Sequence, residues 1–304
     1  MLVFTPIELP DGVRGEVLTE CRAPTLYREL SGLLPSVDTW RPWLAQLVAD
    51  PSALPGYATL KYSKSGEVFR ARFAGRHDQP LDVVCRFSRS DGGGTSFLKR
   101  PSRAQRTLRR AVRLLHVGID TAIPLARIER TSPPRLSWLV TEFVADAVDL
   151  DQIVLTLLSQ LDQTALHEVK TRVLTALVEL FASLERAGLY HRDLKASNIL
   201  LTNWDSVEEA ARPMLVDLDG LHHRRWWSRR RQWQPLTRLA ASLRDYPTLT
   251  RTDFARFLHR YLPRVGLPTA EWKAHFRRIA RNATDYAQRS QLRKAHKLDG
   301  FTGA

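Results

Sequence analysis

The sequence predicts an α+β fold in two parts: a smaller, strand-rich part with one helix, followed by a larger helical part. Three runs rich in β-branched and aromatic residues lie between residues 58 and 87, and a helical repeat begins at residue 103. Beyond Asp149 apolar residues recur mostly at helical spacing. A chain of 304 residues is long enough for two such lobes with a cleft between them.

The first part is expected to contain three antiparallel strands. They cover residues 58–62, 68–73 and 81–87, and polar turns with glycine or proline separate them. The preceding residues 1–55 have a mixed composition with frequent proline, and only residues 40–49 suggest a helix.

A polar loop with three glycines leads to Ser102, a residue type that commonly begins helices. A basic helix is therefore predicted for residues 103–115, where apolar residues repeat at helical spacing. The further predicted elements are strands at 125–130 and 137–143 and helices at 153–161 and 166–187. Aromatic and apolar residues from 253 to 297 predict more helices with a basic outer face.

The composition indicates an anionic partner. Lys and Arg number 46 against 32 Asp and Glu, a formal net charge of +14. Such a balance favours nucleic acid, an anionic membrane or a phosphorylated substrate. The two cysteines, Cys21 and Cys85, form no metal-ligand or disulfide pattern, which fits a reducing compartment. We find no secretory signal pattern and no apolar run of about 18 residues, so any membrane association is expected to be peripheral.

The most specific motif is His191-Arg192-Asp193 with Asn198 five residues after the aspartate. This spacing is that of the catalytic loop of kinases. Phosphoryl transfer needs a carboxylate to orient the acceptor hydroxyl and take its proton, and Asp193 is the candidate. Asn198 is placed to bind a metal ion, and Lys195 is placed to neutralise charge on the transferring phosphate.

A second acidic element follows at Asp217, after the apolar residues 214–216. A hairpin between residues 199–201 and 214–216 would bring Asp193 and Asp217 to one end, as in the metal-binding motif of kinases. Asp217 is therefore predicted to bind Mg²⁺, with Asp219 as a helper. The alternative is that both aspartates are ordinary turn carboxylates.

These motifs predict a two-lobed, protein-kinase-like fold with a small β-rich N-lobe that contains one helix and a larger helical C-lobe. The expected division is an N-terminal extension at 1–57, an N-lobe at 58–144 and a C-lobe at 145–304. Residues 138–144 would run into the hinge that binds adenine, which makes Glu142 and Val144 candidate nucleotide contacts. An ordinary buried strand is the equal alternative there.

Several segments around the catalytic loop resemble the kinases that phosphorylate lipopolysaccharide core sugars, the family of Kdo kinases and heptose kinases. They are residues 102–106, 114–115, 118–125, 188–200, 216–220 and 224–243. The resemblance covers roughly residues 58–262. It implies ATP and Mg²⁺ as cofactors and a sugar hydroxyl of the lipopolysaccharide core, or of a similar anionic glycolipid, as the acceptor. It also implies a cytoplasmic protein at the inner face of the inner membrane.

Three departures from the kinase pattern leave weak or altered catalysis, or a pseudokinase that binds without phosphorylating, as the alternative. The first hairpin has Gly66 but no Gly-x-Gly-x-x-Gly loop. The lysine that contacts the α- and β-phosphates is replaced by Arg86 in one alignment and by Cys85 in another, and Lys99 is a candidate substitute. The helix at 103–115 contains no acid, and Thr107 stands where its paired glutamate is expected.

A basic and aromatic segment follows Gly220. Its arginines are the candidate contacts to an anionic acceptor, and its tryptophans suit sugars or a membrane interface. These arginines are Arg224, Arg225, Arg229, Arg230 and Arg231. The alternatives are a solvated run of charge or, less favoured, a nucleic-acid-binding protein. No pattern in the sequence selects between Kdo and heptose or sets an oligomeric state.

Overall fold

The computed structural model describes residues 2–21, 32–63, 66–75, 79–90, 101–130, 132, 134–223 and 233–299, with side chains omitted at 90 and 292–299. The chain forms two compact units. The first comprises Met1–His116 and Thr121–Ala145, and the second comprises Val117–Asp120 and Asp146–Ala304. In the described ranges no helix is long and apolar enough to cross a membrane.

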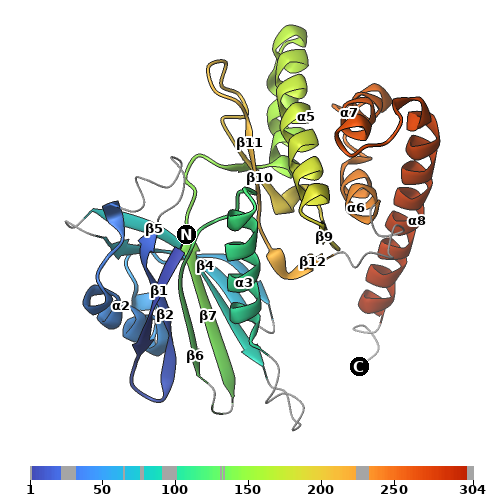
Figure 1. Cartoon of the computed structure of the whole chain (residues 1–304). Helices are drawn as coiled ribbons and strands as arrows, with labels where there is room; N and C mark the ends of the chain where they lie inside the picture. Colours follow the sequence, from blue (N-terminus) through green and yellow to red (C-terminus); the bar gives the residue numbers. More distant parts are fainter. Residues whose placement is uncertain are drawn as a thin grey trace. The chain divides into compact units, whose positions relative to one another are not determined.

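The first unit is built on a seven-stranded antiparallel sheet with the order β1-β2-β6-β7-β5-β4-β3 (Figure 1). Strands β3, β4 and β5 confirm the three strands predicted between residues 58 and 87. Strands β6 and β7 confirm the two predicted at 125–130 and 137–143. The strands are β1 (Leu2–Glu8), β2 (Val13–Cys21), β3 (Ala58–Ser63), β4 (Gly66–Ala74), β5 (Pro80–Ser90), β6 (Pro124–Arg130) and β7 (Arg135–Glu142).

The hairpin of β1 and β2 is the main difference from the sequence prediction, which placed no strand before residue 58. β2 pairs with β6, so this hairpin extends the sheet at one edge. Pro6 lies within β1 and cannot donate to a ladder, which argues against a strand in the sequence. An edge strand tolerates proline because one side of its backbone has no partner strand.

Two helices cover opposite faces of this sheet. Helix α2 (Val37–Ala49), which overlaps the predicted helix, packs Trp40 against Phe73 with ring centroids 4.4 Å apart. Helix α3 (Arg103–His116) packs Leu108 against Leu139 of β7. Ser102 accepts a hydrogen bond from the backbone N–H of Gln105 at 2.9 Å, which confirms the predicted start of α3.

The second unit is mostly helical, as predicted. Its helices are α4 (Leu150–Gln152), α5 (Gln163–Arg186), α6 (Gln234–Leu243), α7 (Arg251–Arg264) and α8 (Trp272–Asp299). Short strands pair as β8 (Val148–Asp149) with β10 (Ile199–Thr202), β10 with β11 (Arg212–Leu215), and β9 (Leu189–His191) with β12 (Leu221–His223). The single helix predicted at 153–161 is instead a π-helical turn, Ile153–Leu157, followed by a 3₁₀ turn, Leu158–Gln160.

Aromatic side chains pack together where α5 meets α7. Phe181 of α5 contacts the rings of Phe257 and Tyr261 of α7 edge-on, with centroids 5.7 and 6.4 Å away. Phe257 and Tyr261 stack on each other, as expected for residues one turn apart on a helix. These contacts confirm the predicted apolar face of the C-terminal helices. They support α5, whose C-terminal end at Arg186 precedes β9 and the catalytic loop.

Candidate active site

The catalytic loop lies between β9 and β10 and contains a 3₁₀ turn, Ala196–Asn198. The side-chain amide of Asn198 donates a hydrogen bond to the backbone carbonyl of Asp193 at 3.0 Å. The Lys195 Nζ lies 3.3 Å from the Asp193 Oδ2. The loop therefore brings Asp193, Lys195 and Asn198, all predicted from the motif, into direct contact with one another.

The Asp193–Lys195 ion pair is open to solvent. The side chain of Asp193 is 49% exposed and that of Lys195 is 50% exposed. An exposed pair of this kind contributes at most about 1 kcal/mol to stability. Both side chains can consequently exchange the ion pair for contacts to a bound substrate at little cost.

The predicted hairpin beside the loop is present. Ile199 of β10 pairs with Leu215 of β11, and the backbone N–H of Val216 donates to the carbonyl of Asn198 at 3.0 Å. Asp217 follows directly, with a left-handed φ of 54° that non-glycine residues seldom adopt. The chain thus turns sharply at the predicted metal-binding aspartate, next to Asn198.

His191 links the catalytic loop to the segment that carries Asp217. Its side chain is buried, with 1% exposed, and its Nε2 lies 3.1 Å from the backbone carbonyl of Asp217. A carbonyl can only accept, so Nε2 donates in this bond. On the neighbouring residue, the backbone N–H of Arg192 donates to the carbonyl of Gly220 at 2.7 Å. Two bonds therefore fix the catalytic loop to the segment that carries Asp217.

The residues present fit a hard cation such as Mg²⁺. The nitrogen of the Asn198 amide is used in the bond to Asp193, so the amide oxygen is the atom that remains to bind a cation. Asp217, which directly follows the Val216 N–H that is bonded to Asn198, carries a carboxylate, the other ligand type that such cations prefer. No group of three or more His, Cys, Asp or Glu side chains suited to a metal occurs in the described part of the chain.

In the first unit, the structure separates Arg86 from Cys85. Both lie on β5, where alternate side chains point to opposite faces of the sheet. Cys85 belongs to the core with no exposed surface, and this burial raises the pKa of its thiol. Arg86 is paired with Leu139, which packs against α3, so Arg86 lies on the α3 face. Arg86 and Cys85 thus lie on opposite faces of the sheet, and which of them takes the position of the phosphate-binding lysine stays a prediction.

Glu142 and Val144 follow the end of β7. Glu142 Oε1 accepts a hydrogen bond from the backbone N–H of Ile123 at 2.9 Å, and the Glu142 N–H donates to the Ile123 carbonyl. These bonds tie the end of β7 to the residue before β6. Val144 is partly exposed. The nucleotide role of both residues stays a prediction.

Other predicted residues lie outside the described ranges. They are Lys99 and the basic group Arg224, Arg225, Arg229, Arg230 and Arg231.

Comparison with known proteins identifies a matching family and a similar solved structure. A model of the lipopolysaccharide kinase (Kdo/WaaP) family matches residues 96–261, which is more than half of the 304 residues. The chain belongs to this family. A solved structure described as WaaP in complex with acyl carrier protein is also similar, with a TM-score of 0.56 and 22% sequence identity. The match covers 86% of this chain and 97% of that one, and shows a shared fold. No curated protein matches the chain in sequence.

Membership in the lipopolysaccharide kinase (Kdo/WaaP) family confirms the resemblance drawn from the sequence and supports a phosphotransferase. The matched residues 96–261 include the catalytic loop and Asp217.

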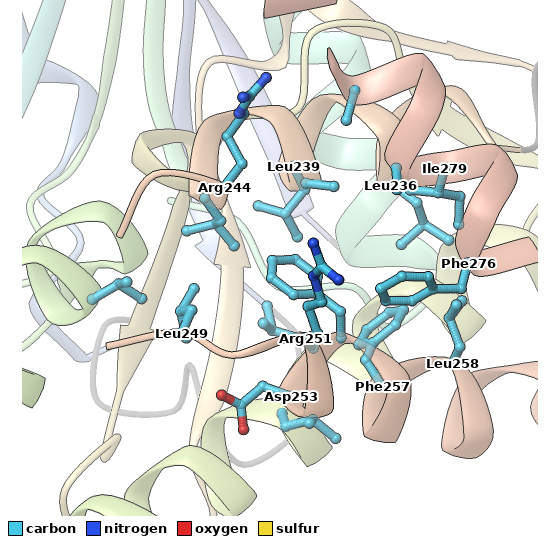
Figure 2. Close-up of a pocket in the computed structure, with 18 of the residues that line it drawn as sticks. Leu236, Leu239, Arg244, Leu249, Arg251, Asp253, Phe257, Leu258, Phe276 and Ile279 are labelled. Carbon is cyan, nitrogen blue, oxygen red and sulfur yellow. The ribbon is translucent and has the colours of Figure 1, made fainter. Parts of the chain in front are cut away.

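This lipopolysaccharide kinase family member also has a large apolar cavity that the sequence analysis did not predict. The cavity has a volume of about 670 Å³ and lies in the second unit, among α4, α5, α6, α7 and α8 (Figure 2). Leu236, Leu239, Phe257 and Phe276 are among the residues that line it. The apolar spacing of these helices is the same whether they pack together or enclose a cavity, so the sequence held no signal for it.

Four arginines also line this cavity: Arg244, Arg251, Arg277 and Arg281. Lys170 and Asp253, which form an ion pair, line it as well. Apolar walls with a few polar or charged groups are typical of small-molecule sites.

Proposed function

We propose that this chain is a two-lobed, protein-kinase-like enzyme that transfers the γ-phosphoryl group of ATP to a sugar hydroxyl of the lipopolysaccharide core, Kdo or heptose, or of a similar anionic glycolipid. The observation that carries the proposal is the arrangement of the catalytic loop. Asn198 holds the backbone of Asp193, and bonds from His191 and Arg192 hold the segment with Asp217. The family match supports the acceptor class.

In this reaction the acceptor hydroxyl gives its proton to the carboxylate of Asp193. The hydroxyl oxygen forms a new bond to the γ-phosphorus as the bond to the leaving oxygen of ADP breaks. Lys195 begins in an ion pair with Asp193 and can turn to the transferred phosphoryl group, whose negative charge it would stabilise. The exposed setting of both side chains supports entry of a large, lipid-linked acceptor.

The cofactor would be ATP with Mg²⁺, which links the phosphates to the protein and offsets their charge. Asn198 and Asp217 would bind the metal. Arg86, and Lys99 from the adjoining segment, would contact the phosphates. The backbone at Glu142 and Val144 would bind adenine.

The basic segment with Arg224, Arg225, Arg229, Arg230 and Arg231 would bind the anionic acceptor and the anionic membrane surface at the cytoplasmic face of the inner membrane. Each arginine near such a surface contributes about 1 kcal/mol, so together they could hold the protein there reversibly.

The experiment combines purified protein, Mg²⁺, γ-³²P-labelled ATP and lipopolysaccharide of defined core structure. We expect label in the lipopolysaccharide, with its position on Kdo or heptose found by mass spectrometry. Nucleotide binding without transfer would instead indicate a pseudokinase. That alternative is suggested by helix α3, which has no acidic residue. Tight, salt-sensitive binding of nucleic acid that survives loss of Asp193 would indicate the nucleic-acid-binding alternative.

We also propose an acyl carrier protein as a protein partner. The similar WaaP structure supports this, because its description names such a complex. The apolar cavity with its arginines suits an acyl chain attached to an acidic protein, and the net charge of +14 favours an acidic partner.

Binding can be measured with acylated and unacylated acyl carrier protein against the wild type and Leu239→Trp, which places an indole in the cavity. We expect acylated carrier to bind more tightly to the wild type and the variant to lose this preference. Ala210→Trp, on the exposed loop before β11, is the matched control. Equal affinity for both carriers would contradict the use of the cavity.

A further inference from the structure

The backbone amide of Ala196 is satisfied by a side chain from a distant helix. Ala196 begins the 3₁₀ turn of the catalytic loop and is buried. Lys195, the residue before the turn, supplies no side-chain cap. The acceptor is the Oγ of Ser242 on α6, at 3.1 Å and 46 residues away in sequence.

The hydroxyl of Ser242 is itself held in position. It donates to the backbone carbonyl of Leu239, one turn earlier on α6, at 2.9 Å. Because the single proton is used in this bond, the lone pairs of the oxygen remain for the N–H of Ala196. In the bond between α6 and the loop, the N–H of Ala196 is therefore the donor and the oxygen of Ser242 is the acceptor.

A second contact joins α6 to the same loop. The side-chain amide of Gln234, at the N-terminal end of α6, lies 3.4 Å from the backbone carbonyl of Arg192. The two points of contact, Arg192 and Ala196, are on either side of Asp193 and Lys195. Helix α6 thus contacts the loop on both sides of the residues proposed to act in the reaction.

Helix α6 also has buried apolar residues. Leu236, Leu239 and Leu243 are buried and line the apolar cavity described above. Ser242 lies on this helix next to Leu243, so it links the packed helices of the unit to the reactive loop.

We infer that Ser242 is a positioning residue for phosphoryl transfer, which holds the catalytic loop so that Asp193 and Lys195 meet the acceptor in the correct geometry. This inference rests on the proposed function for its kinetic consequence. Loss of the hydroxyl leaves a buried N–H without its acceptor, and the loop must shift to find another. Since the transition state depends on the position of Asp193, the shift should lower kcat more than it changes KM.

The test compares Ser242→Ala, Ser242→Thr and the control Thr248→Ala. Thr248→Ala also removes a partly buried hydrogen bond, but this bond goes from the Thr248 hydroxyl to the carbonyl of Val154 at 2.9 Å rather than to the loop. We expect Ser242→Ala to lower kcat about tenfold, which corresponds to the loss of one hydrogen bond, with KM for ATP little changed. Ser242→Thr retains the hydroxyl and should recover most of the rate, and Thr248→Ala should keep the rate of the wild type.

A second readout separates this inference from the proposed function. Amide hydrogen exchange of a peptide covering residues 193–200 should be faster in Ser242→Ala than in Thr248→Ala, whether or not the protein transfers phosphate. Unchanged exchange, or equal kcat in the two alanine variants, would overturn the role of Ser242. If exchange rises in a protein that shows no transfer, the loop contact stands and the proposed reaction fails.

Discussion

The Nε2 of His191 lies 3.1 Å from the backbone carbonyl of Asp217, and it joins the strand that leads into the catalytic loop to the segment that carries the second aspartate. His191 is buried beneath Gly220, whose backbone carbonyl accepts from the next residue along the loop, Arg192. The positions of Asp193 and Asp217 therefore depend on the space around one imidazole ring.

Gly220→Ala should disturb this ring. A Cβ at position 220 would lie 2.7 Å from the His191 Cε1, closer than real contacts allow, and the buried ring has little room to move. We expect a loss of kcat of at least tenfold and a lower melting temperature. Steady-state kinetics and thermal unfolding would measure the two effects.

Gly32→Ala is the matched control for that substitution. A Cβ at position 32 would meet no atom within 4 Å, so activity and melting temperature should stay close to those of the wild type. Equal behaviour of the two variants would mean that the packing of Gly220 on His191 has no influence on the site.

Arg86 is expected to contact the phosphates of the nucleotide. Arg86→Ala should raise the KM for ATP several-fold, whereas Arg86→Lys should retain most of the affinity because it keeps the charge on the α3 face. Isothermal titration with a non-hydrolysable ATP analogue would measure the difference. Unchanged affinity in Arg86→Ala would assign the phosphate contact to another residue.

The two thiols should be unreactive in the folded protein. Cys21 and Cys85 are both buried, and burial raises the pKa of the Cys85 thiol, so little thiolate forms at neutral pH. A thiol reagent such as dithionitrobenzoate should label neither residue in the native protein and both after unfolding in guanidinium. Fast labelling of one native thiol would contradict the core packing of its strand.

The ion pair of Asp253 with Lys170 should make stability depend on pH. Burial alone would raise the pKa of Asp253, but hydrogen bonds from Lys170 and Thr250 outweigh it and lower the pKa below its usual value. A lowered pKa gives stability that is present above the unfolded value, about 3.9, and is lost as pH falls through the folded value. Asp253→Asn should therefore reduce the free energy of unfolding by about 1–3 kcal/mol at pH 7 and by much less near pH 3.

Asp245→Asn is the control for Asp253, because Asp245 is paired with Arg244 but is 79% exposed. Its effect at pH 7 should stay below about 0.5 kcal/mol. Urea unfolding of the three proteins at both pH values would test the difference. A penalty for Asp253→Asn that persists at pH 3 would show that charge is not its cause.

The close arrangement of Asp193 and Asn198 could be predicted from the motif, because the two residues lie five positions apart in a short stretch of chain. Their catalytic role stays a prediction. The hairpin with Leu215 followed from two adjacent apolar runs. The edge strand β1 was missed since Pro6 is unfavourable in most strands and acceptable only where a backbone edge is unpaired.

Contacts made between distant segments were harder to predict. Nothing near Ser242 in the sequence indicates that it meets Ala196, because the bond depends on how α6 packs. The apolar cavity was missed for a related reason: its lining residues come from several helices and the turns between them, and each helix shows only the usual apolar face. The irregular turns at Ile153–Leu157 likewise lack a local signal that distinguishes them from a regular helix.

The most direct test of the central claim is the rate of ³²P transfer from γ-labelled ATP to lipopolysaccharide by the wild type and by Asp193→Asn, with nucleotide binding measured on both. Asparagine keeps the shape of the side chain but cannot accept the proton of the acceptor hydroxyl. The account predicts that the variant binds ATP with unchanged affinity and loses at least a hundredfold in transfer rate. Equal transfer by the two proteins would contradict it.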